Sequence, residues 1–152
     1  MKKLSVILAT IFISASTAFA ATFHSNDSDE RPITFEQLPA EAQNFIKSYF
    51  SPADISYAII DKGIFFDDYS VMFTNGDKLE FDDDGKWTEV QCRKSAVPQA
   101  IVPKQIVDYV KQYYPTATIN EIKRDRNEWE VKLSGGLEFK FNSSFRLVEV
   151  DD

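Results

Sequence analysis

The sequence predicts an α+β fold of two tandem repeats, each a helix followed by a four-strand meander. Together the strands form an antiparallel sheet with the helices packed on one face. Three observations predict this fold. Residues 33–94 resemble residues 95–152, each half opens with apolar residues at helical spacing, and the apolar residues then alternate with polar ones. Such alternation is typical of antiparallel strands with one buried face.

The internal similarity has two parts, which differ by the length of one loop. Leu38–Ile55 aligns with Val102–Ile119 at a shift of 64 residues. Tyr69–Phe73 aligns with Trp129–Leu133 at a shift of 60, so the first half is four residues longer within Lys62–Asp68. Two aligned stretches separated by one loop-sized difference indicate a duplication.

Each half begins with an amphipathic helix. The apolar residues of Leu38–Tyr49 are spaced four, three, one and three positions apart, and Val102–Tyr113 repeats this spacing, which marks one helix face. Pro39 and Pro103 suit the first helical turn, where a missing N–H costs nothing. Thr34–Gln37 fits a capping box and predicts a short preceding turn of helix.

Eight strands are predicted after the helices. They are Ile55–Ile60, Tyr69–Thr74, Lys78–Asp82 and Lys86–Gln91 in the first half, and Ile119–Lys123, Glu128–Ser134, Leu137–Phe141 and Phe145–Val150 in the second. Asn75-Gly76 and Gly135-Gly136 indicate two-residue hairpins with type I′ turns, because these turns need positive φ at both positions.

The N-terminus has the three parts of a secretory signal peptide. Residues 1–20 contain two lysines, an apolar run and the small-residue site Ala18-Phe19-Ala20. We therefore expect cleavage near Ala20 and a periplasmic or secreted protein. Residues 21–32 are polar and acidic and are predicted to form a flexible leader before a single domain at 33–152.

Composition limits the partners of the mature chain. Removing Lys2 and Lys3 leaves 15 basic and 24 acidic residues, a net charge of −9. An acidic chain without a basic patch is a poor nucleic-acid binder, so no nucleic acid is expected. No apolar stretch after the signal peptide approaches the ~20 residues of a membrane span, so no membrane insertion is expected.

Residues that could perform catalysis are not arranged for it. His24, the only histidine, lies in the leader, where packing cannot hold it as a base. Cys92 is the only cysteine, so an intrachain disulfide is impossible; we favour a half-buried strand cysteine over pairing between chains. No carboxylate pair, phosphate-binding glycine loop or His/Cys metal set stands out. We expect a non-enzymatic protein without a cofactor, calcium excepted.

The order of the motifs resembles the PepSY-like family of small exported proteins, which are typical of Bacteroidetes. Both halves show a proline before an amphipathic helix, then V-x-F/L-x-N/G-G, then L/F-x-F-D/N, and after a short turn W/L-x-E-V. The resemblance covers roughly Ile33–Asp152. It implies two tandem motifs similar to beta-lactamase inhibitory protein, and the related PepSY domains are associated with the restraint of peptidases.

Strand parity separates a face under the helices from an open face with charges of both signs. Its candidate partner-binding residues are Met72, Lys78, Glu80, Glu130, Lys132, Glu138 and Lys140. In beta-lactamase inhibitory protein, which the family resembles, the open sheet face binds a protein partner. A solvated sheet face without a ligand is the alternative interpretation.

The longer loop of the first half contains Ile64-Phe65-Phe66. The repeated core does not require these residues, and alternation cannot bury three consecutive apolar side chains. Phe65 and Phe66 are therefore either a contact site for a partner or an extension of the core.

The segment Glu80–Gly85 has the alternating acids and the Asp-Gly ending of a calcium loop, with Asp82 and Asp84 as candidate ligands. Gln91 stands where such a loop places a bidentate glutamate. The alternative is a tight hairpin turn, which Asp and Gly also favour. The second half has Asn142-Ser143-Ser144 at this point, so the repeat requires a turn and not a charge.

These features predict a periplasmic, non-enzymatic protein that binds a protein or peptide through its open sheet face or edge loops. One alternative is the inhibition of a hydrolase of the peptidase or beta-lactamase type. A second alternative is a calcium-responsive periplasmic module.

Overall fold

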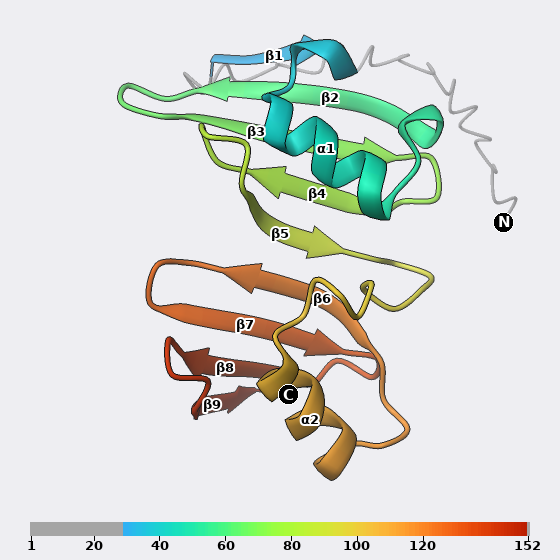
Figure 1. The fold of residues 1–152 in the computed structure, drawn as a ribbon, viewed down its shortest axis with the longest axis vertical. Helices are drawn as coiled ribbons and strands as arrows, with labels where there is room; N and C mark the ends of the chain where they lie inside the picture. The colour runs from blue at the N-terminus through green and yellow to red at the C-terminus, as the bar shows by residue number, and fades with distance from the viewer. Residues whose placement is uncertain (1–28, 152) are drawn as a thin grey trace, which may run out of the picture.

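The computed structural model describes residues 29–151, in which nine strands form one antiparallel sheet in chain order (Figure 1). The strands are β1 (Asp29–Ile33), β2 (Ile55–Lys62), β3 (Asp67–Phe73), β4 (Lys78–Phe81), β5 (Trp87–Gln91), β6 (Ile119–Arg124), β7 (Glu128–Leu133), β8 (Glu138–Asn142) and β9 (Leu147–Asp151). The helices are α1 (Ala40–Tyr49) and α2 (Lys104–Tyr113), with short 3-10 turns η1 (Phe35–Gln37) and η2 (Pro52–Asp54). The predicted α+β class and antiparallel sheet are confirmed, while the duplication stays a prediction. The signal peptide and residues 21–28 of the leader lie outside the described residues.

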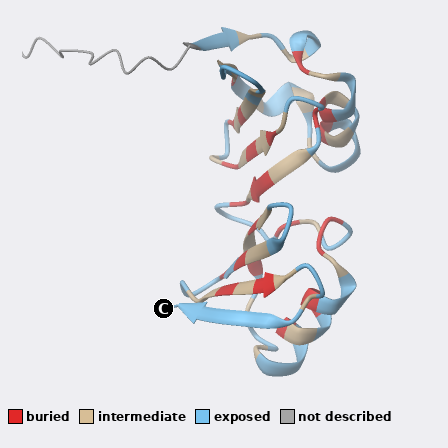
Figure 2. Cartoon of the chain, turned by 90° about the vertical axis from the view of Figure 1, so that its left-hand side faces the viewer, coloured by how far each residue is buried: buried red, intermediate tan, exposed pale blue. Residues whose placement is uncertain are grey.

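Both helices pack on the same face of the sheet (Figures 1 and 2). Pro39 and Pro103 occupy the position just before each helix, with ψ of 145° and 137°, and do not lie in its first turn. The predicted turn at Thr34–Gln37 is present, with the Thr34 amide donating to Gln37 Oε1 at 2.8 Å. Within residues 29–151, no helix is long and apolar enough to cross a membrane.

One hydrophobic core runs under both helices and across the sheet. Its centre consists of side chains that are fully buried on six consecutive strands: Val71, Leu79, Val90, Ile122, Val131 and Phe139. Each helix adds an aromatic ring edge-on to a strand phenylalanine. Phe45 lies 5.8 Å from Phe81, and Tyr109 lies 5.4 Å from Phe141, between ring centroids. The predicted buried parity of the strands is therefore correct.

The end of the predicted leader is a strand. Residues 29–32 were expected to be flexible, but they belong to β1, which pairs antiparallel with β2 over its whole length from Asp29↔Lys62 to Ile33↔Ala58. A polar strand at a sheet edge buries little, so it shows no apolar alternation in the sequence. Pro32 is compatible with this position because an edge strand leaves one row of N–H groups unpaired.

The two glycine hairpins have three-residue loops, so the prediction of two-residue turns is wrong. The Phe73 amide donates to Asp77 O at 2.9 Å, and the Leu133 amide donates to Leu137 O at 2.8 Å. In the first loop only Gly76 has a positive φ, of 91°. Asn75 instead accepts the Asp77 amide through its side chain at 2.9 Å. This side-chain bond competes with the type I′ conformation.

The β4–β5 turn (82–86) and the β8–β9 turn (142–146) share one geometry. In each, the first side chain accepts the amide of the last residue, at 2.8 and 3.0 Å. The fourth residue has a positive φ in both, 81° at Gly85 and 58° at Phe145. Phe145 is the only non-glycine with positive φ in the described part of the chain. This conformation costs a non-glycine residue about 1–2 kcal/mol.

Substituting Gly85 tests how closely α1 packs on the sheet. A Cβ at Gly85 would lie 2.7 Å from Pro39 Cβ, whereas a Cβ at Gly136, where φ is also positive, would meet nothing within 4 Å. We expect Gly85→Ala to lower the free energy of unfolding by about 2–4 kcal/mol, because conformational strain and a steric clash add. Gly136→Ala, the control, should lose only the strain, about 1–2 kcal/mol. Urea denaturation measures both, and equal losses would contradict the packing argument.

Candidate functional site: the open sheet face

The predicted open-face residues lie where strand parity placed them. Met72 pairs with Lys78 across β3 and β4, and Glu130 with Lys140 and Lys132 with Glu138 across β7 and β8. Their neighbours in sequence are buried on the helix side. Their location is therefore settled, whereas their role in binding stays a prediction.

The central strands add residues that the sequence analysis missed. Glu89 and Gln91 of β5 pair with Lys123 and Glu121 of β6, and they continue the open face between the two halves. They were missed because the β4–β5 register shifts after Glu80 and leaves Thr88 without a partner. A bulge of this kind reverses the parity that a sequence pattern implies.

All four lysines of the open face contact glutamates. The Nζ–Oε distances are 2.5 Å for Lys78–Glu80, 3.1 Å for Lys123–Glu121, 3.7 Å for Lys132–Glu138 and 3.0 Å for Lys140–Glu149. Such partly exposed pairs contribute little stability each. The network therefore organises the charges of this face but leaves the lysine side chains free to exchange partners.

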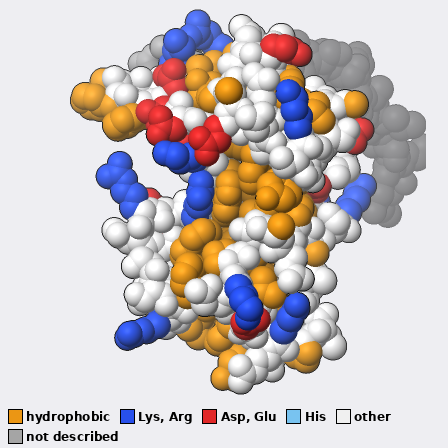
Figure 3. Space-filling view, viewed as in Figure 1, with side chains coloured by type: hydrophobic (Ala, Val, Ile, Leu, Met, Phe, Trp, Pro, Cys, Tyr) orange, Lys and Arg blue, Asp and Glu red, His pale blue; other side chains and the backbone are white. Residues whose placement is uncertain are grey.

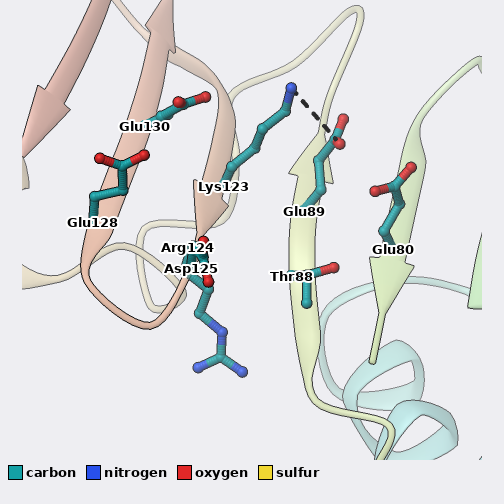
Figure 4. A pocket seen from close by; sticks show the side chains of 8 residues that line it. All are labelled: Glu80, Thr88, Glu89, Lys123, Arg124, Asp125, Glu128 and Glu130. Atoms are coloured by element: carbon teal, nitrogen blue, oxygen red, sulfur yellow. Dashed lines mark ion pairs between the residues drawn. The ribbon is translucent and has the colours of Figure 1, made fainter. Parts of the chain in front are cut away.

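An acidic depression of about 270 Å³ lies at the centre of the open face (Figure 4). It is lined by Glu80, Thr88, Glu89, Lys123, Arg124, Asp125, Glu128 and Glu130. Lys123 is 3.8 Å from Glu89 in this depression, while the Arg124 side chain points away from the glutamates (Figure 4). Carboxylates therefore outnumber the cations that face them.

Glu89 is the electrostatically unfavourable carboxylate of the depression. Its residue is 9% exposed, and burial, followed by the charge of Glu80, raises its pKa above the ordinary value. Burial also acts on the neighbouring Glu121, but hydrogen bonds from Gln91 and Lys123 outweigh it and lower that pKa. The site thus contains one carboxyl group that lacks sufficient positive charge nearby.

Next to the depression, the open face has an apolar patch on the first half. Tyr57 is 47% exposed and pairs with Met72 across β2 and β3, and Ile59 lies two residues further along β2. Met72 is therefore one of several large apolar residues on this face. The shift in register between Ile55 and Tyr57 hid the tyrosine from the strand pattern.

Phe65 and Phe66 lie at the tip of the β2–β3 hairpin and not on the sheet face. Their exposed fractions are 86% and 64%, and that of Ile64 is 95%. Figure 3 shows this apolar tip projecting from the upper left of the molecule. An extension of the core is therefore the wrong interpretation of these residues, and their role as a contact site stays a prediction.

The candidate calcium ligands lie in the β4–β5 turn. Asp82 Oδ1 accepts the Lys86 amide at 2.8 Å, and Asp84 Oδ2 is 3.0 Å from Lys86 Nζ. Over residues 29–151, no three Asp, Glu, His or Cys side chains are arranged as a metal site. The turn geometry alone explains the aspartate at position 82.

Cys92 is buried and follows β5 directly. Its residue is 1% exposed, compared with the half-buried strand position that we expected. Burial, followed by the charge of Asp77, raises the pKa of its thiol to about 11. The sulfur is therefore a protonated core group in the folded domain.

A protein-family model described as "Putative beta-lactamase-inhibitor-like, PepSY-like" matches residues 67–149, which is more than half of the chain. The chain belongs to the PepSY-like family. The predicted membership of this family is confirmed, while the two tandem motifs that the resemblance implied stay a prediction. Among curated proteins, none matches the chain.

Three solved structures from Bacteroides are similar to this chain. A periplasmic protein of the DUF2874 family from Bacteroides vulgatus, itself described as putative, is 48% identical with a TM-score of 0.78. A "putative calcium-regulated periplasmic protein" from Bacteroides thetaiotaomicron is 43% identical with the same TM-score, and each match covers 82% of this chain and 98% of the other. Another periplasmic protein from B. vulgatus, described as of unknown function, is 30% identical with a TM-score of 0.76 over 81% and 99% of the chains.

Replacing Glu89 tests the electrostatics of the depression of this PepSY-like protein. A raised pKa means that the folded state favours the protonated carboxyl, so stability falls as the pH rises through that pKa. Glu89→Gln mimics the protonated form. It should be more stable than the wild type at pH 7, by on the order of 1 kcal/mol, and equal to it below about pH 4. Urea unfolding at both pH values, with exposed Glu149→Gln as the control, measures this; a destabilised Glu89→Gln protein at pH 7 would refute it.

Proposed function

We propose that this PepSY-like protein is a periplasmic, non-enzymatic binding protein whose open sheet face engages a protein or peptide partner. The single observation behind the proposal is the acidic depression beside an exposed apolar patch on one face. The periplasmic relatives and the predicted signal peptide at residues 1–20 support the location.

The partner should present a basic side chain next to an apolar one. The basic group enters the depression near Glu80 and Glu89, where the Lys123–Glu89 pair is long at 3.8 Å and weak enough to be replaced. The apolar group contacts Tyr57 and Met72, because tyrosine is frequent among residues that dominate binding energy. The charge gives specificity and the apolar contact gives affinity.

Such binding could serve to inhibit a hydrolase. The family is described as beta-lactamase-inhibitor-like, which supports this form of the proposal. A sheet face that covers an enzyme cleft would block substrate without any catalytic residue of its own. Peptidases and beta-lactamases are therefore the enzymes to test first with the purified mature domain.

We also propose that the two halves arose by duplication. Four residues are skipped where the register between neighbouring strands shifts. Ser56 has no residue opposite it in the β2–β3 pairing, and Asn120 has none in the β6–β7 pairing. Thr88 and Val148 are skipped in the same way in the β4–β5 and β8–β9 pairings. These positions are 64 and 60 residues apart, the same shifts that align the sequence. Bulges at matching positions are expected of copies because they are built into a fold.

A photo-crosslinking amino acid at Met72 tests the binding surface. It should capture a partner from periplasmic extract that the same group at Gln112, exposed on α2, does not capture. Glu80→Lys with Glu130→Lys should weaken capture at least ~10-fold, because like charges then face the basic group of the partner. The control is Glu36→Lys with Asp108→Lys, which changes the net charge equally but outside the open face. Equal capture from Met72 and Gln112 would contradict the proposal.

Calcium binding is a second candidate, because the relative that is 43% identical is described as calcium-regulated. The β4–β5 turn offers Asp82, Asp83 and Asp84, and calcium would have to displace Lys86 from Asp84. Calcium bound at this position would change the conformation of the β4–β5 turn.

Thermal unfolding decides on calcium. At a calcium concentration 100 times the Kd, binding stabilises by ~2.7 kcal/mol, so Tm should rise by about 10 °C over the EGTA-treated protein. Asp82→Asn with Asp84→Asn should abolish the shift, and magnesium at the same concentration should not produce it. An unchanged Tm at 10 mM calcium would end this candidate.

A further inference from the structure

A second surface lies on the other side of the junction between the halves, where the β2–β3, β4–β5, β6–β7 and β8–β9 turns meet at one end of the sheet. A groove of about 680 Å³ runs there. Its floor contains Trp87, Trp129 and Phe145, with centroid distances of 6.0 and 5.8 Å along this series. Figure 3 shows apolar surface joining the two halves, with basic side chains beside a notch at its left.

Arg124 in this groove is an unusual residue for its position. It pairs with Trp129 across β6 and β7, which places its side chain on the apolar, helix-covered face. Its Cζ lies 4.4 Å from the centroid of the Trp87 ring, and its Nε donates to Trp87 O at 2.5 Å. Burial lowers the pKa of Arg124, while Asp82 and Glu41 act in the opposite direction from a distance.

The terminal nitrogens of Arg124 have no partner within residues 29–151. No carboxylate lies within 4.0 Å of them, and the Nε bond to Trp87 is the only hydrogen bond of the guanidinium there. These terminal nitrogens are open to solvent, because no buried side-chain nitrogen or oxygen within residues 29–151 lacks a hydrogen-bond partner. The free edge of the planar fork matches a carboxylate, which it would bind through two parallel hydrogen bonds.

Phe145 is a second unusual residue in the same groove. It takes the positive φ that Gly85 takes in the equivalent turn, so a glycine would form the turn without strain. What the phenylalanine adds is its ring, 5.8 Å from Trp129 on the groove floor. Departures from local rules that coincide at one surface indicate a functional site.

We propose that this groove binds the C-terminus of a peptide. Arg124 holds the terminal carboxylate, and Trp129 and Phe145 contact the side chain of the last, apolar residue. Asp82 and Asp125 on the rim accept N–H groups of the peptide backbone. These aspartates would repel a bare anion, so the groove selects a carboxylate that is accompanied by N–H donors. The groove shares Thr88, Arg124 and Asp125 with the lining of the acidic depression, but the Arg124 guanidinium lies on the helix-covered side, and the proposal does not depend on the function proposed for the open face.

Intrinsic fluorescence gives a direct test, because Trp87 and Trp129 are the only two tryptophans of the chain. The mature protein is titrated with N-acetyl-Ala-Ala-Phe, with the same peptide carrying a C-terminal amide, and with acetate. We expect a saturable change with the free acid and at least ~10-fold weaker binding of the amide. Equal affinity for acid and amide, saturation by acetate alone, or no change with the acid at millimolar concentration would overturn the proposal.

Variants separate binding from folding. Arg124→Lys keeps the charge but loses the fork, and Arg124→Met keeps only the stem, so both should bind the acid peptide at least ~10-fold more weakly. Arg146→Met, outside the groove lining, is the matched control and should bind as the wild type. Phe145→Gly should stay folded, since glycine adopts the positive φ of this position without strain, while peptide binding weakens. Wild-type affinity in a folded Arg124→Lys or Phe145→Gly protein would refute the assignment.

Discussion

The short ladder between β5 and β6 is the contact on which the rest of the structure depends. It has three residue pairs, centred on Val90 and Ile122, which are both completely buried. Past one end the Cys92 amide donates to Asn120 O at 2.7 Å, and at the other end Arg124 donates to Trp87 O. Each half has only about 60 residues, which is a marginal size for an independent core. The ladder therefore joins the two halves by giving them a continuous sheet and a shared core.

The same ladder positions both proposed binding surfaces. Lys123 and Arg124 are neighbours in β6, so their side chains point to opposite faces of the sheet. Lys123 lies with Glu89 in the acidic depression, and Arg124 lies on Trp87 in the aromatic groove. A slip of one residue in the β5–β6 pairing would move Lys123 to the helix-covered face and Arg124 to the open face, because the register determines the face on which each side chain lies. Such a slip would also move the buried Val90 and Ile122 out of the core, so their burial fixes the register and with it the positions of Lys123 and Arg124.

The sequence predicted the parts of the fold that repeat a pattern and missed the parts that interrupt one. Helical spacing and strand parity correctly predicted the two helices, the eight strands after them and the open-face positions of β3, β4, β7 and β8. Bulges at Ser56 and Thr88 hid Tyr57 and Glu89, because one extra residue reverses parity without changing composition. β1 was missed because a polar edge strand buries little, and only Ile33 at its end packs against the core. Arg124 could not be found at all, since its importance comes from an aromatic environment that only the folded sheet assembles.

The halves differ where the proposed surfaces lie, and this difference is itself informative. Helix spacing, buried parity and turn geometry recur in both halves, so the fold accounts for them. The fold does not account for Phe145 in the conformation that Gly85 adopts, nor for Trp87 where the second half has Leu147. It accounts equally little for the exposed Phe66, which lines the aromatic groove from the longer hairpin. Phe145 is unfavourable for the backbone and Phe66 is exposed, whereas Trp87 also packs on Phe45 of α1, with ring centroids 6.1 Å apart. All three lie along the groove that we propose as a peptide site, and a site of that kind would explain their presence together.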